Sequence, residues 1–337
     1  MRSAVVAGHV CVDLIPELPA LPLARPGELV EIGPLAMSAG GCVSNTGGDL
    51  AALGADVHVV GDAGEDELGT ALVRLLRARG TRIDQLRLLP GRSTSYSIVV
   101  QRPGEDRSFW HHVGANTEFD GSDVDFAGAG LLHVGYPSLL PALIATGGAA
   151  LEALLARARG EGLTTSLDLA VLDPDSAVAA YDWPALLARV LPLVDVFSPS
   201  LDDVRAPLDL DGADDAASLR RTARQLVEMG AAIVLLTAGR AGLHLSTADA
   251  PRLAGAGAAF AGDEARQAQW ASRDEYVPAL EVDVHTTVGA GDAATAGLLY
   301  GLLAGLGPVE SLRLAARTAA DVVSGAAIAR VDLETAS

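Results

Sequence analysis

The sequence predicts an α/β fold built around a mostly parallel β-sheet. Short strand-like runs alternate with helix-like runs over most of the 337 residues, which is the pattern of successive βαβ units. Several strand-like runs are almost continuously apolar, as strands buried on both faces of a parallel sheet are. Half of the residues are hydrophobic, so a chain of this length can bury a large core. We therefore expect one folded domain over residues 1–337.

The expected elements follow one another along the chain. Apolar and β-branched runs predict strands at 4–12, 57–61, 95–101, 131–135, 165–169, 194–197 and 232–237. Longer runs predict helices at 44–53, 67–79, 141–159, 216–229, 292–304 and 309–327. Parallel strands need crossover connections, and these helices supply them.

Three segments interrupt this alternation. Residues from about 14 to 38 are rich in Pro and Leu, and residues 92–116 combine strand-like alternation with Arg, His and Trp. These two segments either pair as a small β lid over a site or form two long surface loops. Residues 248–276 are rich in Ala and Gly and otherwise polar, so we expect a surface insertion there.

The charge composition disfavours whole classes of partner. The net charge is -19, and all 24 basic residues are arginine, with no lysine. Nucleic-acid binding needs a basic face, which this balance does not favour. A P-loop mechanism is excluded because it depends on a lysine. Phosphate contacts must therefore come from arginine, backbone amides or a metal ion.

The cysteines and the apolar runs bear on the compartment. Cys11 and Cys42 stand far apart without a CxxC pattern, as expected of reduced core residues in a cytoplasmic protein. The N-terminal apolar run is too short for a signal peptide. No stretch reaches 18 uninterrupted apolar residues, so we expect no membrane partner.

The stretch 286–292, Thr-Thr-Val-Gly-Ala-Gly-Asp, carries the strongest chemical signal. Its glycines allow a close backbone approach to a phosphate, and a small, apolar helix follows. Asp292 at that helix start suits a general base for a hydroxyl, although a plain helix cap is the alternative. The stretch also fits the dinucleotide fingerprint GxGxxA, but it lies too close to the C-terminus for a Rossmann half to follow.

A second glycine-rich segment, 38–54, precedes it by most of the chain length. The two segments in this order resemble the two signatures of the ribokinase-like PfkB family of carbohydrate kinases. The resemblance implies a three-layer α/β/α sandwich with a mostly parallel central sheet and a small β lid. It also implies ATP-dependent phosphorylation of a hydroxyl of a sugar or sugar-like acceptor, with Mg²⁺ as a cofactor.

The resemblance assigns roles to individual residues. Asp292 would be the base, and the amides of Gly289, Ala290 and Gly291 would form the anion hole. Residues that would bind the acceptor are Asp13, Gly40, Gly41, Asn45, Arg107, His111 and Asn116, with Trp110 covering an apolar face. Alternatives are a cap role for Asn45, a turn role for Asp13, solvent-facing lid residues, or a metal site at the tandem His111 and His112.

For the nucleotide, the resemblance implies contacts from Thr237, Gly239, Arg240, Gly242 and Ser200. Asp203 would act on Mg²⁺ through water, and Asp168 ends a strand near the same crevice. The chain departs from the family pattern at three places. Ser200 replaces an amide, Thr286 replaces the Asp of members with a monovalent-cation site, and 315–320 lacks an Asn. Potassium dependence and adenine preference therefore stay open.

Two further functions compete with a sugar kinase. A nucleoside kinase of the same fold would stack a base on Trp110 or Phe109. A sugar- or nucleotide-binding sensor would keep the fold and lose efficient catalysis, through the altered pair Ser200 and Asp203. Many family members dimerise through lid strands, and the sequence leaves monomer and homodimer equally open.

Overall fold

A computed structural model describes residues 2–18, 26–100, 108–126, 128–210 and 215–331. Its main feature is a nine-stranded sheet in the order β13-β12-β11-β10-β9-β8-β1-β4-β5. Neighbouring strands are parallel except for β11–β12 and β12–β13, which are antiparallel. The strands are β1 (Ser3–Gly8), β4 (Val57–Gly64), β5 (Arg82–Leu89), β8 (Ala129–Gly135), β9 (Thr164–Leu167), β10 (Val196–Phe197), β11 (Ile233–Thr237), β12 (Leu243–Thr247) and β13 (Asp274–Val277).

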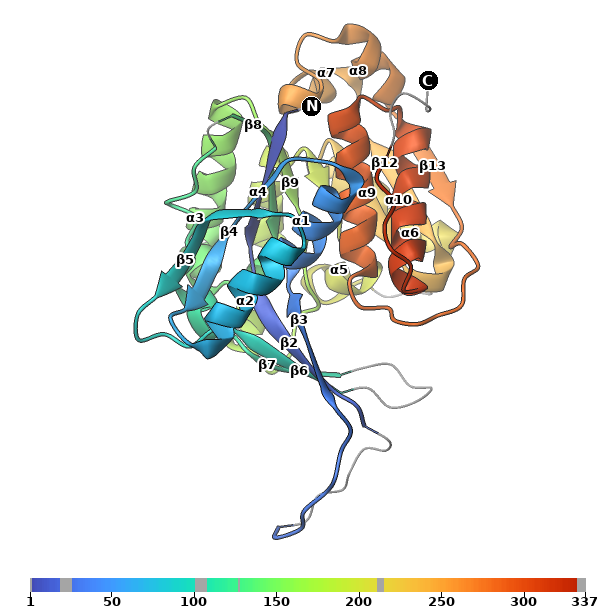
Figure 1. The fold of residues 1–337 in the computed structure, drawn as a ribbon. Helices are drawn as coiled ribbons and strands as arrows, with labels where there is room; N and C mark the ends of the chain where they lie inside the picture. Colours follow the sequence, from blue (N-terminus) through green and yellow to red (C-terminus); the bar gives the residue numbers. More distant parts are fainter. Residues whose placement is uncertain (1, 19–25, 101–107, 127, 211–214, 332–337) are drawn as a thin grey trace.

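Helices cover both faces of this sheet (Figure 1). Alternate side chains of β1 enter two separate cores, Ala4 and Val6 on one face and Val5 and Ala7 on the other. The first core is closed by α1 (Cys42–Leu53), α2 (Glu67–Ala78), α9 (Ala290–Ala304) and α10 (Pro308–Val323). The second is closed by α3 (Pro141–Gly160), α4 (Trp183–Val190), α5 (Leu201–Leu208) and α6 (Ala216–Glu228). Both faces of the sheet are therefore buried, which explains its continuous apolar runs.

A four-stranded sheet in the order β3-β2-β6-β7 forms the lid. Its strands are β2 (Cys11–Pro16), β3 (Leu35–Gly40), β6 (Tyr96–Val100) and β7 (Ser108–His112). Figure 1 shows the β2–β3 hairpin extending away from the main body. The predicted α/β fold with a mostly parallel sheet and a small lid is confirmed, and the two interrupting segments do pair with each other.

The strand predicted at 4–12 is in fact two strands in two sheets. β1 ends at Gly8, and β2 begins at Cys11 in the lid. Gly8 has a φ of 133°, and a Cβ there would lie 2.4 Å from the carbonyl oxygen of Gly135. Only glycine fits this contact. The chain leaves the main sheet at this turn and enters the lid.

The prediction of a surface insertion at 248–276 is wrong. The segment contains α7 (Ala250–Ala254), α8 (Glu264–Trp270) and part of β13, which extends the main sheet. Leu253, Phe260 and Trp270 are buried in the first core. These three large side chains anchor the segment in the core. Its composition, which is mostly Ala, Gly and polar residues, gives little sign of them.

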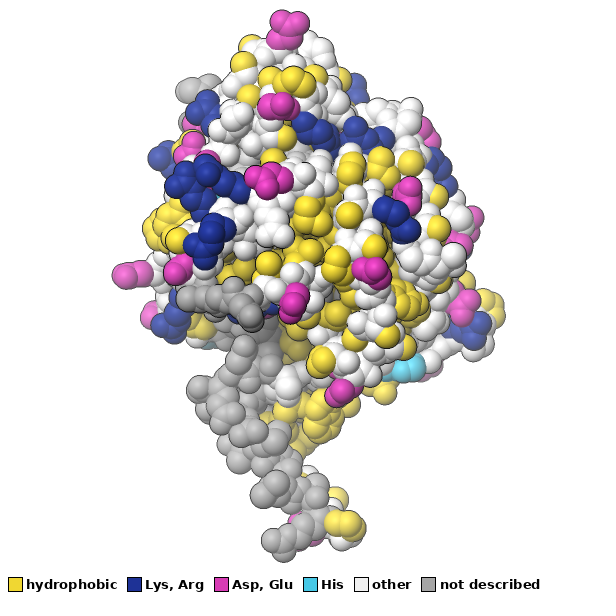
Figure 2. Space-filling view, turned by 180° about the vertical axis from the view of Figure 1, so that it is seen from behind, with side chains coloured by type: hydrophobic (Ala, Val, Ile, Leu, Met, Phe, Trp, Pro, Cys, Tyr) yellow, Lys and Arg dark blue, Asp and Glu magenta, His cyan; other side chains and the backbone are white. Residues whose placement is uncertain are grey.

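Charges of both signs share the surface. On the face shown in Figure 2, arginine side chains lie beside acidic ones, and a band of apolar side chains runs between them. Among the described residues, no helix has the length and hydropathy that a membrane span requires.

Candidate active site

The start of α9 presents backbone amides at one end of a buried helix. Gly289 precedes the helix with a left-handed φ of 77°, which suits glycine. In the described part of the chain, the amides of Gly289 and Gly291 have no hydrogen-bond partner, and the Ala290 amide makes only a long bond of 3.4 Å to Thr287 O. Free amides and the helix dipole both favour negative charge. This end of α9 can therefore hold an anion.

Three side chains hold the carboxylate of Asp292. Asn45 Nδ2 donates to Oδ2 at 3.0 Å, and Thr46 Oγ1 donates to Oδ1 at 2.9 Å, both from α1. The Tyr136 hydroxyl, just after β8, donates to Oδ2 at 2.6 Å. Burial raises the pKa of Asp292 above its usual value, and the three donors oppose that shift. The result is an oriented carboxylate of increased basicity beside the anion-binding amides.

The glycine pair makes room for two polar side chains. A Cβ on Gly40 would lie 2.3 Å from Asp13 Oδ2 of the neighbouring strand β2. A Cβ on Gly41, whose φ is 81°, would lie 2.6 Å from His9 Nδ1. The absence of a side chain at Gly40 and Gly41 thus leaves the space that the side chains of Asp13 and His9 occupy.

His111 on β7 connects the lid to this region. Its Nδ1 lies 2.9 Å from Ser97 Oγ on β6, and its ring centroid is 5.0 Å from that of His9. Burial, reinforced by His112, lowers the pKa of His111 to about 4. Burial also holds the pKa of His9 well below its usual value. Both imidazoles are therefore neutral near pH 7, so each offers one donor and one acceptor.

Phe109 and Trp110 lie on opposite faces of β7. Successive residues of a strand point to opposite sides, so Phe109 shares a face with His111 and Trp110 does not. Trp110 is 62% exposed. Phe109, which is 46% exposed, is therefore the one on the His111 side of the strand.

Asn116 makes contacts other than those predicted for it. Its side chain is fully buried; Nδ2 donates to Val10 O at 2.9 Å, and Oδ1 accepts from Val10 N at 3.4 Å. The side-chain amide is therefore used to stabilise the backbone of the turn between β1 and β2, and it does not face a ligand. Arg107, predicted beside it, lies outside the described residues.

The expected nucleotide-binding residues gather where β11 ends. Ser200 forms a parallel bridge with Thr237. Gly239 and Gly242 both have positive φ, and a Cβ on Gly242 would lie 2.4 Å from Val277 O. Arg240 between them is exposed. The turn thus leaves a cationic side chain and backbone groups near the start of α5.

Ser200 and Asp203 are bonded to each other. Asp203 Oδ2 accepts from the Ser200 amide at 2.8 Å and from its hydroxyl at 2.6 Å, while the Asp203 amide donates to Ser200 Oγ at 3.1 Å. This capping box begins α5. The pKa of Asp203 is nevertheless raised to about 6, mainly by burial.

Residues 1–332 match the pfkB family of carbohydrate kinases. The chain belongs to this family. It is 27% identical over 303 residues to fructokinase of Klebsiella pneumoniae, covering 89% of this chain and 84% of that protein. Its fold resembles Arabidopsis thaliana ribokinase complexed with ribose and ATP, with a TM-score of 0.72, 20% identity and coverage of 99% and 97%. It also resembles Burkholderia thailandensis nucleoside kinase in complex with inosine, with a TM-score of 0.68, 19% identity and the same coverage.

Carboxylates of this PfkB kinase concentrate negative charge at the site. Burial and then the charges of Asp203 and Asp292 raise the pKa of Asp168 well above its usual value. A divalent cation would relieve that repulsion. Among the described residues, no three acidic, imidazole or thiol groups are grouped to hold a metal ion. Mg²⁺ would fit such a site if it kept its waters and used phosphate oxygens, and Asp203 could then reach it through water.

Sequence reasoning missed three residues that border Asp292 or the lid in this PfkB kinase. Thr46 follows the predicted Asn45 directly, and helical geometry brings both to Asp292. Tyr136 and His9 each follow the C-terminal end of a parallel strand, where ligands bind in open α/β sheets. Their position after a predicted strand could have drawn attention to them. A tyrosine or a histidine at such a position does not by itself indicate a binding site, however, unless the fold is known.

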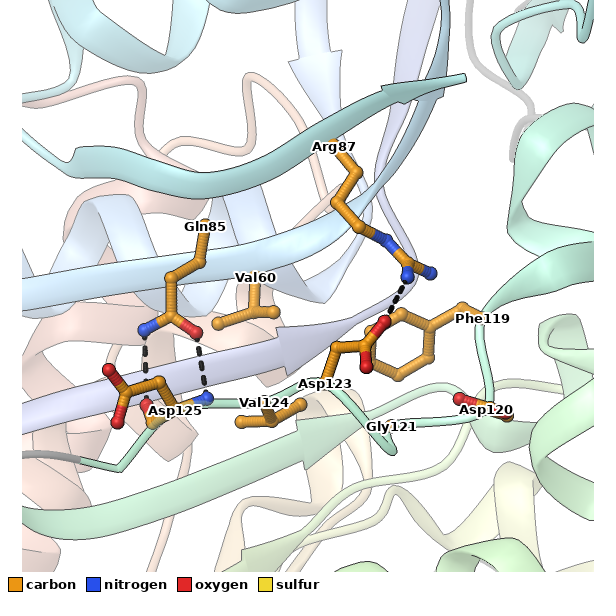
Figure 3. Close-up of a pocket in the computed structure, with 9 residues that line it drawn as sticks. All are labelled: Val60, Gln85, Arg87, Phe119, Asp120, Gly121, Asp123, Val124 and Asp125. Carbon is orange, nitrogen blue, oxygen red and sulfur yellow. Dashed lines mark hydrogen bonds and ion pairs between the residues drawn. The ribbon is translucent and has the colours of Figure 1, made fainter. Parts of the chain in front are cut away.

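A hollow at the edge of the sheet shares no residue with this site (Figure 3). It is lined by Val60, Gln85, Arg87, Phe119, Asp120, Gly121, Asp123, Val124 and Asp125. Arg87 pairs with Asp62 at 2.7 Å and Asp123 at 2.6 Å. The guanidinium of Arg87 is thus already paired with carboxylates of its own surroundings and is not available to an anionic ligand. The region around Asp292 is therefore the better candidate site.

Proposed function

We propose that this PfkB kinase transfers the γ-phosphoryl group of ATP to a hydroxyl of a sugar or sugar-like molecule. The observation that carries the proposal is the oriented carboxylate of Asp292 at the start of α9, where the amides of Gly289 and Gly291 have no partner among the described residues. Both groups serve one reaction, since the carboxylate takes the proton of the attacking hydroxyl and the amides stabilise charge on the transferring group.

In this mechanism the acceptor oxygen forms a bond to the γ-phosphorus as its proton passes to Asp292. The bond between the γ-phosphorus and the β,γ-bridging oxygen breaks, and its electron pair leaves with ADP. The amides of Gly289, Ala290 and Gly291 lie where an anion is favoured. Bound Mg²⁺ would supply neutralisation of phosphate charge.

The acceptor pocket is proposed to lie between the lid and α1. Asp13 supplies a buried carboxylate, and His9 and His111 supply neutral imidazoles. In the described part of the chain, both ring nitrogens of His9 and Nε2 of His111 are buried without a partner. Buried polar atoms of this kind call for a partner, and sugar hydroxyls both donate and accept. Asn45 contributes by orienting Asp292, and Arg107 stays a prediction from sequence.

ATP is proposed to bind along the turn that follows β11. Thr237, Gly239, Arg240 and Gly242 would contact phosphates or ribose, and Ser200 lies beside Thr237. Arg240 is the exposed cation at that turn. A monovalent-cation requirement stays open because Thr286 stands at the family position of an Asp.

Replacing the base tests the proposal directly. Asp292→Asn keeps the shape of the side chain and removes the proton acceptor. Turnover with ATP, Mg²⁺ and the best acceptor from a sugar and nucleoside library should fall by about 10²- to 10⁴-fold. The measurement is acceptor-dependent ADP release at saturating substrates, together with a thermal melt.

The matched control is Asp283→Asn, which removes the same charge from an exposed residue before the signature. Its turnover should equal that of the unaltered kinase. Undiminished turnover in Asp292→Asn would remove Asp292 from the role of base.

Phosphorylation of a nucleoside is the second candidate, favoured by Phe109 on the face of β7 that carries His111. Ligand binding distinguishes the two, because a ligand at 100 times its Kd stabilises the protein by about 2.7 kcal/mol. If nucleosides raised the melting temperature and sugars did not, a nucleoside kinase would become the first candidate and a sugar kinase the second. Tight binding of either class without ADP release would favour a sensor, consistent with the Ser200–Asp203 pair.

A homodimer through the lid is proposed as the assembly. Five apolar residues around the β2–β3 hairpin are exposed, from 39% to 97%: Leu29, Val30, Ile32, Leu35 and Met37. The hairpin projects from the body (Figure 1). Apolar residues gathered on one projecting hairpin are more typical of an interface than of a monomer surface.

A further inference from the structure

Tyr136 has an unusual backbone conformation at the candidate active site. It follows β8 with a left-handed φ of 61°, which is uncommon for a bulky residue and accumulates at functional sites. Its ring stacks on His9 with centroids 6.0 Å apart, and its hydroxyl donates to Asp292 Oδ2 at 2.6 Å. The backbone is thus held in a costly geometry that delivers this hydroxyl to the base.

The hydrogen bonds of Asp292 are divided unequally between its two oxygens. Oδ2 accepts from both Asn45 and Tyr136, whereas Oδ1 accepts from Thr46. Each carboxylate oxygen accepts about two hydrogen bonds. Oδ2 is therefore saturated, and the remaining capacity lies on Oδ1.

We propose that Tyr136 is a positioning residue for phosphoryl transfer, whose hydroxyl occupies Oδ2 of Asp292 so that the acceptor hydroxyl passes its proton to Oδ1. This inference rests on the proposed function and adds to it the accepting oxygen and the residue that selects it. The acceptor O–H bond breaks as its oxygen bonds to the γ-phosphorus, and the proton ends on Oδ1. Tyr136 keeps its own proton and remains a donor to Oδ2 throughout.

The electrostatic surroundings of Asp292 make the Tyr136 hydrogen bond important. Burial and the carboxylates of Asp292 and Asp168 hold the pKa of Tyr136 well above its usual value, so the phenol stays protonated. A hydrogen bond to the ionised form of Asp292 opposes the burial that raises its pKa. The other titratable or charged groups that interact with Asp292 are Arg79 after α2, Cys42 and Asp49 on α1, Asp168 after β9 and Asp203 on α5.

Tyr136→Phe tests the proposal because it removes the hydroxyl and keeps the ring against His9. Losing a donor to the ionised base should raise the pKa of Asp292, so the acid limb of kcat/KM should move to higher pH by about one unit. On that limb the loss is about 10-fold, and it shrinks toward the alkaline plateau. An acid limb that stays in place would overturn the proposal.

A double-mutant cycle provides a readout that needs no acceptor. Tyr136→Phe should lower the denaturant midpoint in the unaltered kinase and leave it unchanged in an Asp292→Ala background. An equal decrease in both backgrounds would make Tyr136 a packing residue only and would overturn the inference. The cycle still decides the question if no acceptor is phosphorylated, so failure of the proposed function is recognised separately.

The matched control is Tyr300→Phe on α9, the helix that carries Asp292. The structure shows no hydrogen bond from the Tyr300 hydroxyl to any described residue. The pH profile of Tyr300→Phe should match that of the unaltered kinase. The coupling energy between Tyr300→Phe and Asp292→Ala should be close to zero. A shift as large as that of Tyr136→Phe would show that the change is not specific to the Asp292 contact and would overturn the assignment.

Discussion

At the scale of single residues, burial competes with ion pairing in the carboxylates beside the site. Asp49 lies 2.6 Å from Arg79, and its side chain is 6% exposed. Burial nevertheless raises its pKa to about 7, because desolvation outweighs the attraction of Arg79, with Asp292 adding to the increase. The partner is partly exposed, at 36%, so water weakens its compensation.

This conflict makes the stability of the kinase depend on pH. The pKa of Asp49 is higher in the folded state than in the unfolded chain, so the folded state holds the extra proton between about pH 4 and pH 7. Its contribution to the free energy of unfolding should therefore fall as the pH rises through that window. As the pH rises from 4 to 7, the free energy of unfolding of Asp49→Asn should increase relative to that of the unaltered kinase by roughly 2–4 kcal/mol. Denaturant titration at each pH measures this difference.

Exposed Asp283→Asn again serves as the control, since it removes one charge without a buried site. A difference between Asp49→Asn and the unaltered kinase that stays constant from pH 4 to pH 7 would contradict the burial argument. A difference that favours the unaltered kinase as the pH rises would show that the Arg79 ion pair outweighs burial.

At the scale of elements, the decisive feature is the short connection between β1 and β2. Sequence pattern predicts one strand at 4–12 because the apolar run is continuous. The break depends on Gly135, which lies against Gly8, and on Asn116, which bonds to Val10. Those partners are more than 100 residues away in sequence, so local pattern cannot reveal them. The same turn places His9 below Gly41.

Removing the Asn116 side chain should loosen this turn. Asn116→Ala leaves the buried amide and carbonyl of Val10 without partners, which should cost about 2–4 kcal/mol of unfolding free energy. Displacement of His9 should also raise the KM for the acceptor, with the KM for ATP unchanged. Denaturant unfolding and steady-state kinetics measure the two effects.

Thr117→Ala is the neighbouring control, because Thr117 is exposed and its hydroxyl bonds, among the described residues, only to near neighbours in sequence, Gly114 O at 2.9 Å and Glu118 Oε1 at 3.5 Å. It should change neither quantity appreciably. If Asn116→Ala changed the KM for ATP as strongly as that for the acceptor, the turn would not act on the acceptor side alone.

At the scale of the whole molecule, two cores hold the main sheet between its helices, and the lid joins the first of them through Val12 of β2 and Ala39 of β3. The site combines residues from α1, from the end of β8, from the lid and from the start of α9. The exposed apolar hairpin extends from that lid. Any partner that covers the hairpin would also stabilise the lid beside the proposed acceptor pocket.

The lid homodimer predicts a concentration-dependent mass. Leu29→Glu with Ile32→Glu places two charges on exposed apolar positions of the hairpin. The doubly substituted kinase should sediment as a monomer at micromolar concentration, whereas the unaltered kinase sediments as a dimer. Leu280→Glu, at a residue that is 45% exposed elsewhere, should remain dimeric. A monomeric unaltered kinase would contradict the proposal.

The amino-acid sequence alone determined the fold class, and it singled out the glycine turn and the acidic residue proposed to act on phosphate, because these depend on local pattern and on short motifs. It also indicated that two separate segments could form a lid. Only the tertiary structure decided which side chains complete the site. Tyr136, Thr46 and His9 reach it through a strained turn, a helix face and a glycine contact, each set by residues distant in sequence. Burial at those contacts tunes the carboxylates, and burial is a property of the folded chain.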